Sequence, residues 1–209
     1  MKIDLSTGRW LNKSEFCSID SDVVIIKTTP KTDFWQRTYY GFRNDNAPVL
    51  QFESDTDFTF TVKVNFDYKS LFDQCGIIIY LNSENWFKAS IEYENKRFSR
   101  LGSVVTNFGY SDWATTDIDT ISSIWYKLSR RGADFLVEYS FDGVGFKQMR
   151  IFHLHELGET TEQMGKSNPP LVSEHPVTFG VYACSPTESS FSATFSEMEI
   201  EPSYWKAHK

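Results

Sequence analysis

Short runs in which apolar residues alternate with polar ones recur along most of the chain. Side chains along a β-strand point alternately to its two faces, so such a run predicts a strand with one face in a core. Alternating or β-branched runs occur at Val23 to Thr29, Phe34 to Tyr40, Phe58 to Phe66, Gly76 to Leu81, Trp86 to Tyr93, Val104 to Phe108, Ile124 to Arg130, Phe135 to Phe141, Val177 to Ala183 and Phe191 to Ile200. With short edge strands added, the pattern predicts about a dozen strands.

Turn signals separate these runs, and no window of helical length keeps the spacing of an amphipathic helix. The clearest hairpin runs from Tyr126 to Arg130 into Asp134 to Phe141 through the turn at Gly132. A tight turn at Asp142-Gly143 then leads into Phe146 to Ile151. The pattern therefore predicts an antiparallel sandwich.

One long irregular region lies between Leu154 and Pro176. It is polar and contains Asn168-Pro169-Pro170, and proline cannot donate to a sheet ladder. A loop of this length is either a mobile lid or an excursion that contains a helix. The strand at Val177 to Ala183 is still needed to complete the sandwich, so we expect residues 1–209 to form a single domain.

Composition narrows the classes of partner. The chain has 209 residues, of which 40% are hydrophobic and 16% aromatic, which is ample for a packed core. Its net charge of −7, with acidic and basic residues interspersed, disfavours nucleic acid and an anionic membrane surface as partners. No apolar run is long enough to span a bilayer, and the charges at Lys2 and Asp4 do not fit a signal sequence. A cytoplasmic location is expected.

The three cysteines also favour a cytoplasmic location. Cys17, Cys75 and Cys184 are odd in number, widely spaced and flanked by apolar residues. This pattern indicates reduced, buried thiols in place of a disulfide framework.

Five short polar-aromatic clusters carry a family resemblance. They are Phe34-Trp35-Gln36-Arg37-Thr38, Asp73-Gln74-Cys75-Gly76, Trp86-Phe87-Lys88, Ser111-Asp112-Trp113 and Val181-Tyr182-Ala183-Cys184-Ser185-Pro186. In this order they closely resemble the domain-of-unknown-function family DUF1349. The resemblance implies an all-β, concanavalin A-like jelly-roll sandwich of two antiparallel sheets, related to lectins and glucanases, with one long irregular loop near residues 154–176. It implies no agreed substrate or reaction.

Polar and aromatic side chains share one face of the strand that begins at Trp86. Residues two apart on a strand lie on the same face, about 6.6 Å apart. Trp86, Lys88, Ser90 and Glu92 therefore form one row, while the opposite row is apolar and predicts core. Tryptophan and tyrosine faces stack on the C–H face of a sugar, and charged or amide groups bond its hydroxyls.

The other family clusters supply further candidates for the same cleft. Trp35, Arg37 and Tyr39 form a second mixed row, and Ser111-Asp112-Trp113 closes one end of the cleft. Their proximity is implied by the resemblance alone. The predicted ligand-binding residues are Trp35, Arg37, Tyr39, Asp73, Gln74, Trp86, Lys88, Glu92, Asp112 and Trp113. The alternative is that the tryptophans pack in or on the sheets, with Arg37 or Lys88 in a surface ion pair with Glu92.

A glycosidase is the enzyme that this fold suggests, because retaining enzymes need two carboxyls about 5 to 5.5 Å apart. The glucanases that the fold resembles carry Glu, one residue, Asp, two or three residues and Glu on one strand. Every acidic pair at this first spacing lacks the third acid. Glu197, Glu199 and Glu201 alternate along the last strand and indicate a solvated face. A pair distant in sequence, such as Asp73 with Glu92, stays open.

Signs of a metal or a nucleophile are weak. His153, His155 and Glu156 have metal-like spacing but lack a further ligand nearby, so no metal and no cofactor is predicted. Asn44-Asp45-Asn46 is compatible with a calcium loop, although a turn explains it better. No nucleophile elbow is present, and no cysteine has a neighbouring histidine.

Three classes of function fit the sequence. The leading one is non-catalytic binding of a small saccharide or related polar metabolite in a concave aromatic cleft. The second is a glycoside-active enzyme whose carboxylates are brought together by the fold. The third is a regulatory domain that uses its aromatic surface against a protein partner, for which Trp, Tyr and Arg are favoured anchors.

Overall fold

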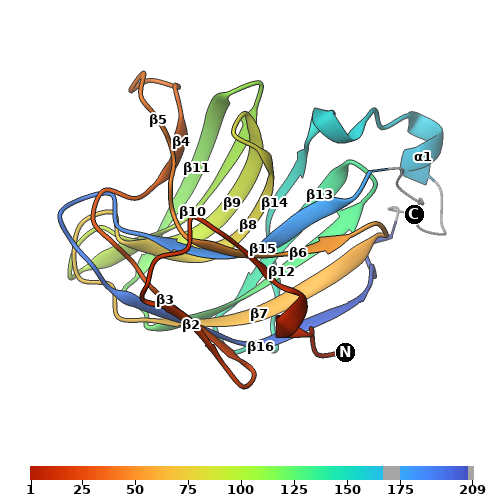
Figure 1. The fold of residues 1–209 in the computed structure, drawn as a ribbon. Helices are drawn as coiled ribbons and strands as arrows, with labels where there is room; N and C mark the ends of the chain where they lie inside the picture. The colour runs from red at the N-terminus through yellow and green to blue at the C-terminus, as the bar shows by residue number, and fades with distance from the viewer. Residues whose placement is uncertain (167–174, 207–209) are drawn as a thin grey trace.

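Two seven-stranded antiparallel sheets lie face to face in the computed structural model, which describes residues 1–166 and 175–206 (Figure 1). The first sheet has the strand order β1, β6, β15, β8, β9, β10 and β11. The bounds of these strands are Arg9–Leu11, Val49–Ser54, Val177–Cys184, Gln74–Asn82, Asn85–Tyr93, Phe98–Asn107 and Tyr110–Asp119, in that order.

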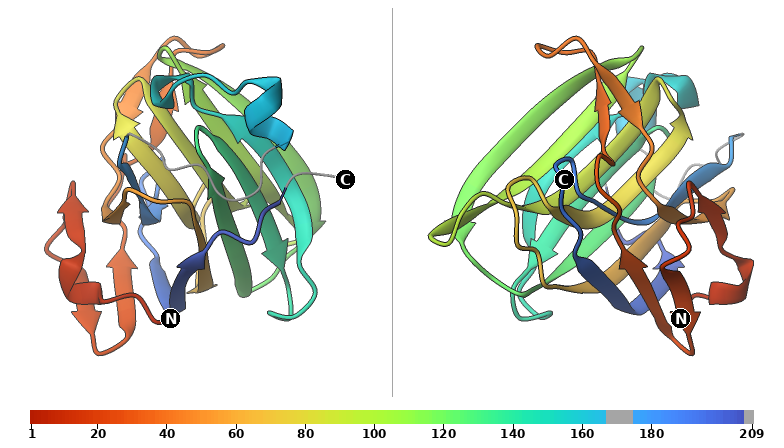
Figure 2. Two further views of the ribbon diagram at one scale, coloured as in Figure 1. Left: turned by 90° about the vertical axis from the view of Figure 1, so that its right-hand side faces the viewer. Right: turned by 60° about the vertical axis from the view of Figure 1, so that its left-hand side comes forward.

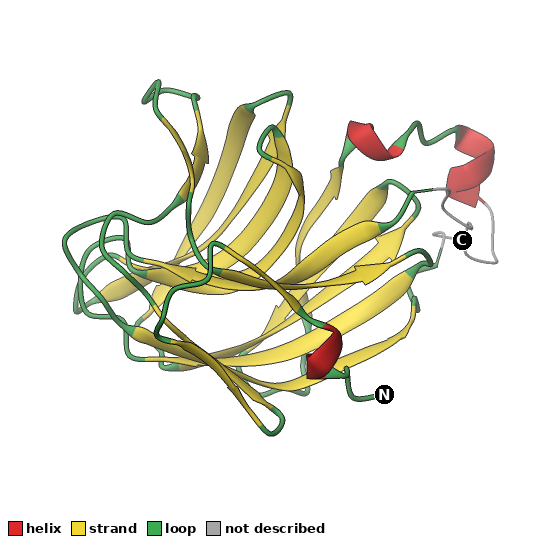
Figure 3. Cartoon of the chain, in the orientation of Figure 1, coloured by secondary structure: helices red, strands yellow, loops and turns green. Residues whose placement is uncertain are grey.

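The second sheet has the order β14, β13, β12, β7, β16, β3 and β2. The bounds of its strands are Lys147–His153, Asp134–Ser140, Ser123–Arg131, Phe58–Phe66, Ser192–Pro202, Val23–Lys27 and Cys17–Asp20, in that order. A separate two-stranded hairpin consists of β4 (Phe34–Gln36) and β5 (Arg43–Asp45). Strands make up most of the chain in Figure 3, and the predicted all-β sandwich is confirmed.

Alternation along β7 shows why these residues form a sandwich. Phe60, Val62 and Val64 are fully buried between the sheets, while Thr61 and Lys63 are half-buried on the other face. Burying one face of each sheet against the other supplies the main driving force for the fold. The predicted hairpin is also confirmed, since β12 pairs with β13 and β13 pairs with β14.

The described part of the chain has sixteen strands, more than the hydrophobic pattern predicts. The additional ones are short, such as β1, β4 and β5 with three residues each. A run of three residues is too short to display a period of two, so the pattern could not reveal them.

Helix is confined to short segments in the described residues. They are the 3-10 turns η1 (Leu5–Thr7) and η2 (His155–Leu157) and the helix α1 (Glu162–Lys166). The last two lie in the predicted irregular region, which thus contains helix, whereas the predicted Asn168-Pro169-Pro170 segment lies outside the described residues. None of the described helices is long and apolar enough to cross a membrane.

Buried apolar side chains of the described residues gather in two separate clusters. The larger fills the space between the two main sheets. The smaller contains Phe34 from the hairpin together with Ile78, Trp86 and Tyr182 from the first sheet. The outer face of that sheet is therefore covered by the hairpin, and this explains why nearly all of β9 is buried.

We expect the three thiols to be free and protected in the folded protein. Cys17, Cys75 and Cys184 are all buried and free. Burial raises the pKa of Cys75 and Cys184 well above the usual thiol value, which suppresses the reactive thiolate. A colorimetric thiol assay should count three thiols per chain in denaturant and show slow reaction without it. A count of one in denaturant contradicts this expectation, because it requires a disulfide.

Candidate functional site

The hairpin β4–β5 rises beside β11 and overhangs the outer face of the first sheet (Figure 2). Its tip turns sharply because Arg37 and Tyr39 adopt positive φ angles of 55° and 63°. The Arg37 N–H donates to the Phe42 carbonyl at 2.8 Å, and Trp35 Nε1 donates to the Thr38 carbonyl at 3.0 Å. These bonds fix the rings of the tip relative to Trp35.

A cavity of about 340 Å³ lies between the hairpin and strands β8, β9 and β10. Aromatic side chains line one side of this cavity. Trp35 meets Tyr40 at a ring-centroid distance of 5.5 Å and Trp113 at 6.3 Å, both edge to face. Tyr40 in turn stacks on Phe42 at 5.4 Å. The cavity therefore has a wall of connected rings, which is the kind of surface that packs on the apolar face of a ligand.

Polar side chains of neighbouring strands form the floor of the cavity. Lys88, Ser90 and Glu92 project from one face of β9, as the period of two predicts. Glu92 lies directly opposite Gln74 on β8 and opposite Arg100 on β10. Residues directly opposite each other on adjacent strands share a face, so the register alone brings these groups together.

Lys88 and Asp33 form a buried ion pair at one side of the floor. Lys88 Nζ lies 3.0 Å from Asp33 Oδ1, and the two side chains are only 4% and 14% exposed. Burial by itself would lower the pKa of Lys88, but the charge and hydrogen bond of Asp33, together with charge interactions with Cys184 and Glu92, outweigh it, so the pKa is raised. The ammonium group therefore stays charged inside the protein.

Glu92 is the buried carboxyl of the floor. Burial raises its pKa to about 7, although the positive charges of Lys88 and Arg100 act in the opposite direction. The carboxylates of Asp33 and Glu94 add to the rise. A carboxyl with a raised pKa binds its proton more tightly in the folded than in the unfolded protein. Its contribution to the free energy of unfolding is therefore present at low pH and is lost as the pH rises from 4.5 to about 7.

One oxygen of Glu92 has no partner. Gln74 Nε2 donates to Glu92 Oε2 at 3.1 Å, whereas Oε1 is buried without any hydrogen bond. Buried polar atoms of folded proteins nearly always have a partner. Glu92 is thus a cavity-lining carboxyl with one oxygen that the protein leaves unpartnered.

Five of the ten predicted residues line this cavity: Trp35, Gln74, Lys88, Glu92 and Trp113. They come from four different strands, so the fold assembles them from distant parts of the chain. That they bind a ligand stays a prediction.

The prediction that Trp86 lines the cleft together with the other polar and aromatic residues of its row is wrong. It shares the outer face of β9 with Lys88, as expected, but it is fully buried and packs in the smaller apolar cluster. Its ring lies 5.7 Å from that of Phe34 on the hairpin. Trp86 therefore belongs to a core and not to the cavity wall.

Arg37 and Tyr39 also lie away from the cavity. The expected strand from Phe34 to Tyr40 ends at Gln36, because positive φ angles at Arg37 and Tyr39 break the alternation. Arg37 pairs with Glu84 at 2.9 Å. Tyr39 is 91% exposed at the tip.

Asp73 and Asp112 have structural partners instead of facing the cavity. Asp73 is fully buried, and one of its oxygens accepts hydrogen bonds from Ser185 and Ser189 at 2.8 and 2.6 Å. Asp112 pairs with Arg150 of the other sheet at 2.9 Å. The open possibility of a catalytic pair of Asp73 with Glu92 loses its basis, because Asp73 does not line the cavity.

Several residues that line the cavity are absent from the predicted set. They are Asp33, Tyr40, Phe42, Asn44, Phe72, Ser90, Arg100, Gly102, Val104, Pro186 and Thr187. Asp33 directly precedes the Phe34-Trp35 cluster, so its position was a usable signal. Arg100 could be found only from the pairing of β9 with β10, which a sequence does not give.

The alternative interpretations are resolved in part. Lys88 pairs with Asp33, and Arg37 with Glu84, so neither forms the surface pair with Glu92. The turn expected at Asn44-Asp45-Asn46 is wrong, because Asn44 and Asp45 lie in strand β5, and the amide of Asn46 donates to the Lys31 carbonyl at 2.9 Å. Within residues 1–166 and 175–206, no group of three or more His, Cys, Asp or Glu is arranged to hold a metal ion.

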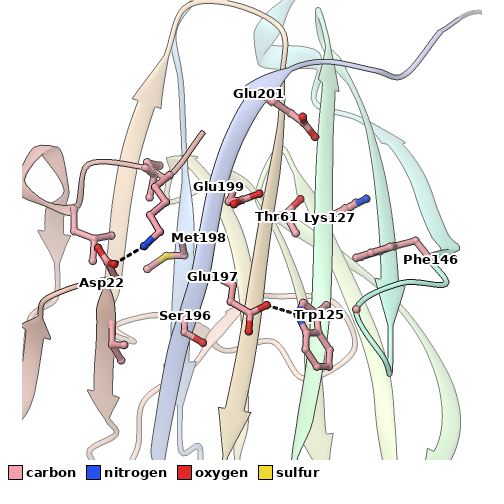
Figure 4. A pocket seen from close by; sticks show the side chains of 15 residues that line it. Asp22, Thr61, Trp125, Lys127, Phe146, Ser196, Glu197, Met198, Glu199 and Glu201 are labelled. Carbon is pink, nitrogen blue, oxygen red and sulfur yellow. Dashed lines mark hydrogen bonds and ion pairs between the residues drawn. The ribbon is translucent and has the colours of Figure 1, made fainter.

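A second cavity, of about 530 Å³, lies on the outer face of the second sheet (Figure 4). A bulge in β16 gives Glu197 a φ of 51°, and its carboxylate accepts a hydrogen bond from Trp125 Nε1 at 3.0 Å. Glu197, Glu199 and Glu201 are exposed, as predicted for the last strand. None of its lining side chains that the structure describes leaves a buried polar atom unpartnered, so the first cavity is the candidate site.

Comparison with known proteins places the chain in a family. The model of the family described as "Protein of unknown function (DUF1349)" matches residues 10–203. The protein named regulation of enolase protein 1, from Saccharomyces cerevisiae, is 31% identical over 205 residues, which span 98% of this chain and 94% of the yeast protein.

Solved structures agree with this relationship. A functionally unknown protein from Saccharomyces cerevisiae superposes with a TM-score of 0.82 at 29% identity, covering 97% of this chain and all of that one. The GH43 BlXynB protein from Bacillus licheniformis has a TM-score of 0.62 at 16% identity over 89% of this chain and 33% of its own, which shows a shared fold alone. Since the family model and the yeast relative both span nearly the whole sequence, the chain belongs to the DUF1349 family.

Proposed function

We propose that the cavity under the hairpin binds a small carbohydrate or a related polar metabolite without chemical conversion. The observation that carries the proposal is the free, buried oxygen of Glu92 on a polar floor that faces a wall of aromatic rings. A sugar has the matching two-sided chemistry, with C–H groups for the rings and hydroxyls for the floor. The fold shared with a GH43 protein is compatible with this class of ligand.

Affinity in such a site is expected to be modest. The aromatic side of the cavity is partly open, since Tyr40 and Trp113 are 54% and 39% exposed. A ligand that stays partly hydrated gains less on binding than one that is fully enclosed. Dissociation constants of about micromolar to millimolar are therefore expected.

Replacing Trp113 by alanine should remove most of the ligand-induced change in tryptophan fluorescence. Trp113 offers a half-exposed ring at the cavity, so its loss removes contacts with ligand and should weaken binding about tenfold or more. The measurement is fluorescence titration with a panel of mono- and disaccharides.

Trp125 provides the matched control for this experiment. It lies on the outer face of the other sheet, in contact with Glu197, so Trp125→Ala should keep the titration curve of the natural protein. An unchanged response in Trp113→Ala, or an equal loss in both variants, contradicts binding in this cavity.

Binding is favoured over hydrolysis by the state of the carboxyls in the cavity. Among the residues that the structure describes, Asp33 and Glu92 are the acidic ones that line it. Asp33 is held by Lys88 at 3.0 Å and by the backbone N–H of Phe34 at 2.7 Å through the same oxygen. A nucleophile or base in a glycosidase must be free to attack or take a proton. The bonds on Asp33 therefore count against the enzyme hypothesis.

A second candidate function is regulation through a protein partner. The tip of the hairpin exposes Tyr39, Tyr40 and Phe42 as contacting rings, and aromatic side chains are frequent anchors of interfaces. The name of the yeast relative, regulation of enolase protein 1, supports a regulatory role. Tyr39→Ala separates the two functions, because it removes an exposed ring that does not line the cavity. Loss of a protein partner with saccharide binding retained favours this second role.

A cytoplasmic location fits the same set of observations. Three buried free cysteines are typical of a reducing compartment, where disulfides rarely form. The net charge of −7 continues to argue against nucleic acid and anionic membranes as partners. Microscopy of a fluorescent fusion checks the location, and a signal confined to the secretory pathway contradicts it.

A further inference from the structure

The carboxyl of Glu92 is held in a fixed orientation while one of its oxygens is left free. Gln74 Nε2 donates to Oε2 at 3.1 Å, and Gln74 Oε1 accepts from the Tyr182 hydroxyl at 3.1 Å. Tyr182 is fully buried, so this chain of bonds is anchored in the smaller apolar cluster. Oε1 has no partner, although Glu92 is only 9% exposed. Glu92 thus lines the cavity with a carboxylate of which one oxygen is satisfied by no protein group.

The two positive charges near Glu92 are already matched by other carboxylates. Lys88 Nζ lies 3.0 Å from Asp33 Oδ1. Arg100 Nη2 lies 3.2 Å from Glu94 Oε2. Within each pair the positive and the negative charge neutralise each other. The charge of Glu92 is therefore left without a counter-ion of its own. A buried charge of this kind is stabilised most by a cation that also donates a hydrogen bond.

The aromatic wall across the cavity favours a cation as well. The faces of indole and phenol rings carry partial negative charge and attract ammonium and guanidinium groups. The guanidinium carbon of Arg100 already lies 5.6 Å from the ring centre of Trp113. A ligand cation between the wall and the floor would interact with the rings and with Glu92 together.

We propose that Glu92 makes the cavity selective for a polyhydroxylated ligand that carries a protonated amine, such as an amino sugar, over the corresponding neutral sugar. This inference rests on the proposed saccharide site and names the chemical class that the site prefers. A neutral hydroxyl satisfies the free oxygen of Glu92 but leaves its charge unmatched. A ligand carboxylate adds a further negative charge beside it. An ammonium group supplies both the hydrogen and the charge.

Selectivity of this origin depends on pH. Lys88, Asp33, Arg100 and Glu94 are the charged groups that face Glu92, and burial raises its pKa to about 7. Below that pH the carboxyl is neutral and does not prefer a cation. Above it the carboxylate is ionised, so the preference for an amine grows as the pH rises from about 6 to about 8, and binding near pH 7 releases a proton.

Calorimetric titration of the full chain with three matched probes tests this inference. The probes are 6-amino-6-deoxyglucose, glucose and 6-deoxyglucose, which present an ammonium, a hydroxyl and a methyl group at one position. An alkylammonium stays protonated up to about pH 9. At about pH 8 the amine should bind about tenfold more tightly than glucose, and at about pH 6 the ratio should fall to about threefold or less. 6-Deoxyglucose should bind most weakly.

Glu92→Gln separates charge from shape. The amide keeps the size of the side chain and its capacity to accept a hydrogen bond but carries no charge, so the quantity compared is the ratio of amine affinity to glucose affinity within each protein. The preference for the amine and its pH dependence should both disappear. The matched control is Glu84→Gln, which removes a carboxylate paired with Arg37 outside the cavity and should keep the preference. In the free protein, Glu92→Gln should also remove the part of the pH slope of stability that lies between 4.5 and about 7.

The outcomes distinguish this inference from the function on which it rests. Equal affinities for the amine and glucose overturn the selectivity and leave saccharide binding intact. Preference for the amine that persists in Glu92→Gln overturns the role of this residue. Absence of binding by all three probes overturns both.

Discussion

Replacing Trp86 by alanine is expected to lower the free energy of unfolding by about 3 to 5 kcal/mol, the usual cost for a fully buried aromatic residue. Trp86 is completely buried between β9 and the hairpin, with its ring 5.7 Å from that of Phe34. Its Nε1 has no hydrogen-bond partner, so the substitution removes ring packing and the contact with Lys88, whose Nζ lies 6.0 Å from the ring centre, but no hydrogen bond. Urea unfolding followed by circular dichroism measures the change.

Trp113→Ala is the natural comparison, because the same residue type is replaced on the adjacent side of the hairpin. Trp113 is 39% exposed, so the free energy of unfolding of this variant should fall by no more than about 1 kcal/mol. If Trp86→Ala proves as mild as Trp113→Ala, the smaller apolar cluster does not hold the hairpin to the sheet.

Asp33→Asn is expected to lower the free energy of unfolding by a comparable amount, about 3 to 5 kcal/mol, because it leaves a buried ammonium group without its counter-ion. Lys88 is 4% exposed and its charge is balanced by Asp33 at 3.0 Å. Asparagine keeps an oxygen that can accept from the Phe34 backbone N–H, so the substitution removes mainly the charge. Denaturant unfolding at neutral pH measures the loss.

The double variant Asp33→Asn with Lys88→Met tests the coupling between the two charges. A buried ion pair replaced as a whole by neutral groups often costs little, since no unmatched charge remains. The double variant should therefore be more stable than Asp33→Asn alone. Strict additivity of the two single losses contradicts a coupled pair.

Local alternation was sufficient to place part of the site from the sequence. Lys88 and Glu92 lie on one face of β9 and Phe87 lies on the other, in the core between the sheets. This prediction succeeds because the two-residue period of a strand depends only on its own backbone. The same reasoning predicted the β12–β13 hairpin, whose turn is encoded by adjacent residues.

Contacts between distant segments explain the failures. Trp86 was predicted to face a cleft, but the segment that covers it includes Phe34, far away in the sequence. Positive φ angles at Arg37 and Tyr39 are uncommon for such residues, so the sequence favoured a continuous strand where the hairpin turns. Arg100 reaches the site through the register of β10 against β9, and sequence alone does not fix which strands are neighbours.

Two rings of the cavity wall stand outside the sheet that carries the floor, whereas Trp113 belongs to that sheet. Tyr40 and Phe42 stand on a two-stranded hairpin, whereas Lys88 and Glu92 stand on a seven-stranded sheet. Substitutions, insertions or deletions at the hairpin tip alter the wall without shifting any strand of the sandwich. For the proposed ligand site, this means that changes at the tip can alter ligand preference while the floor keeps its residues. Ligand specificity can thus change without passing through variants in which the sandwich is destabilised.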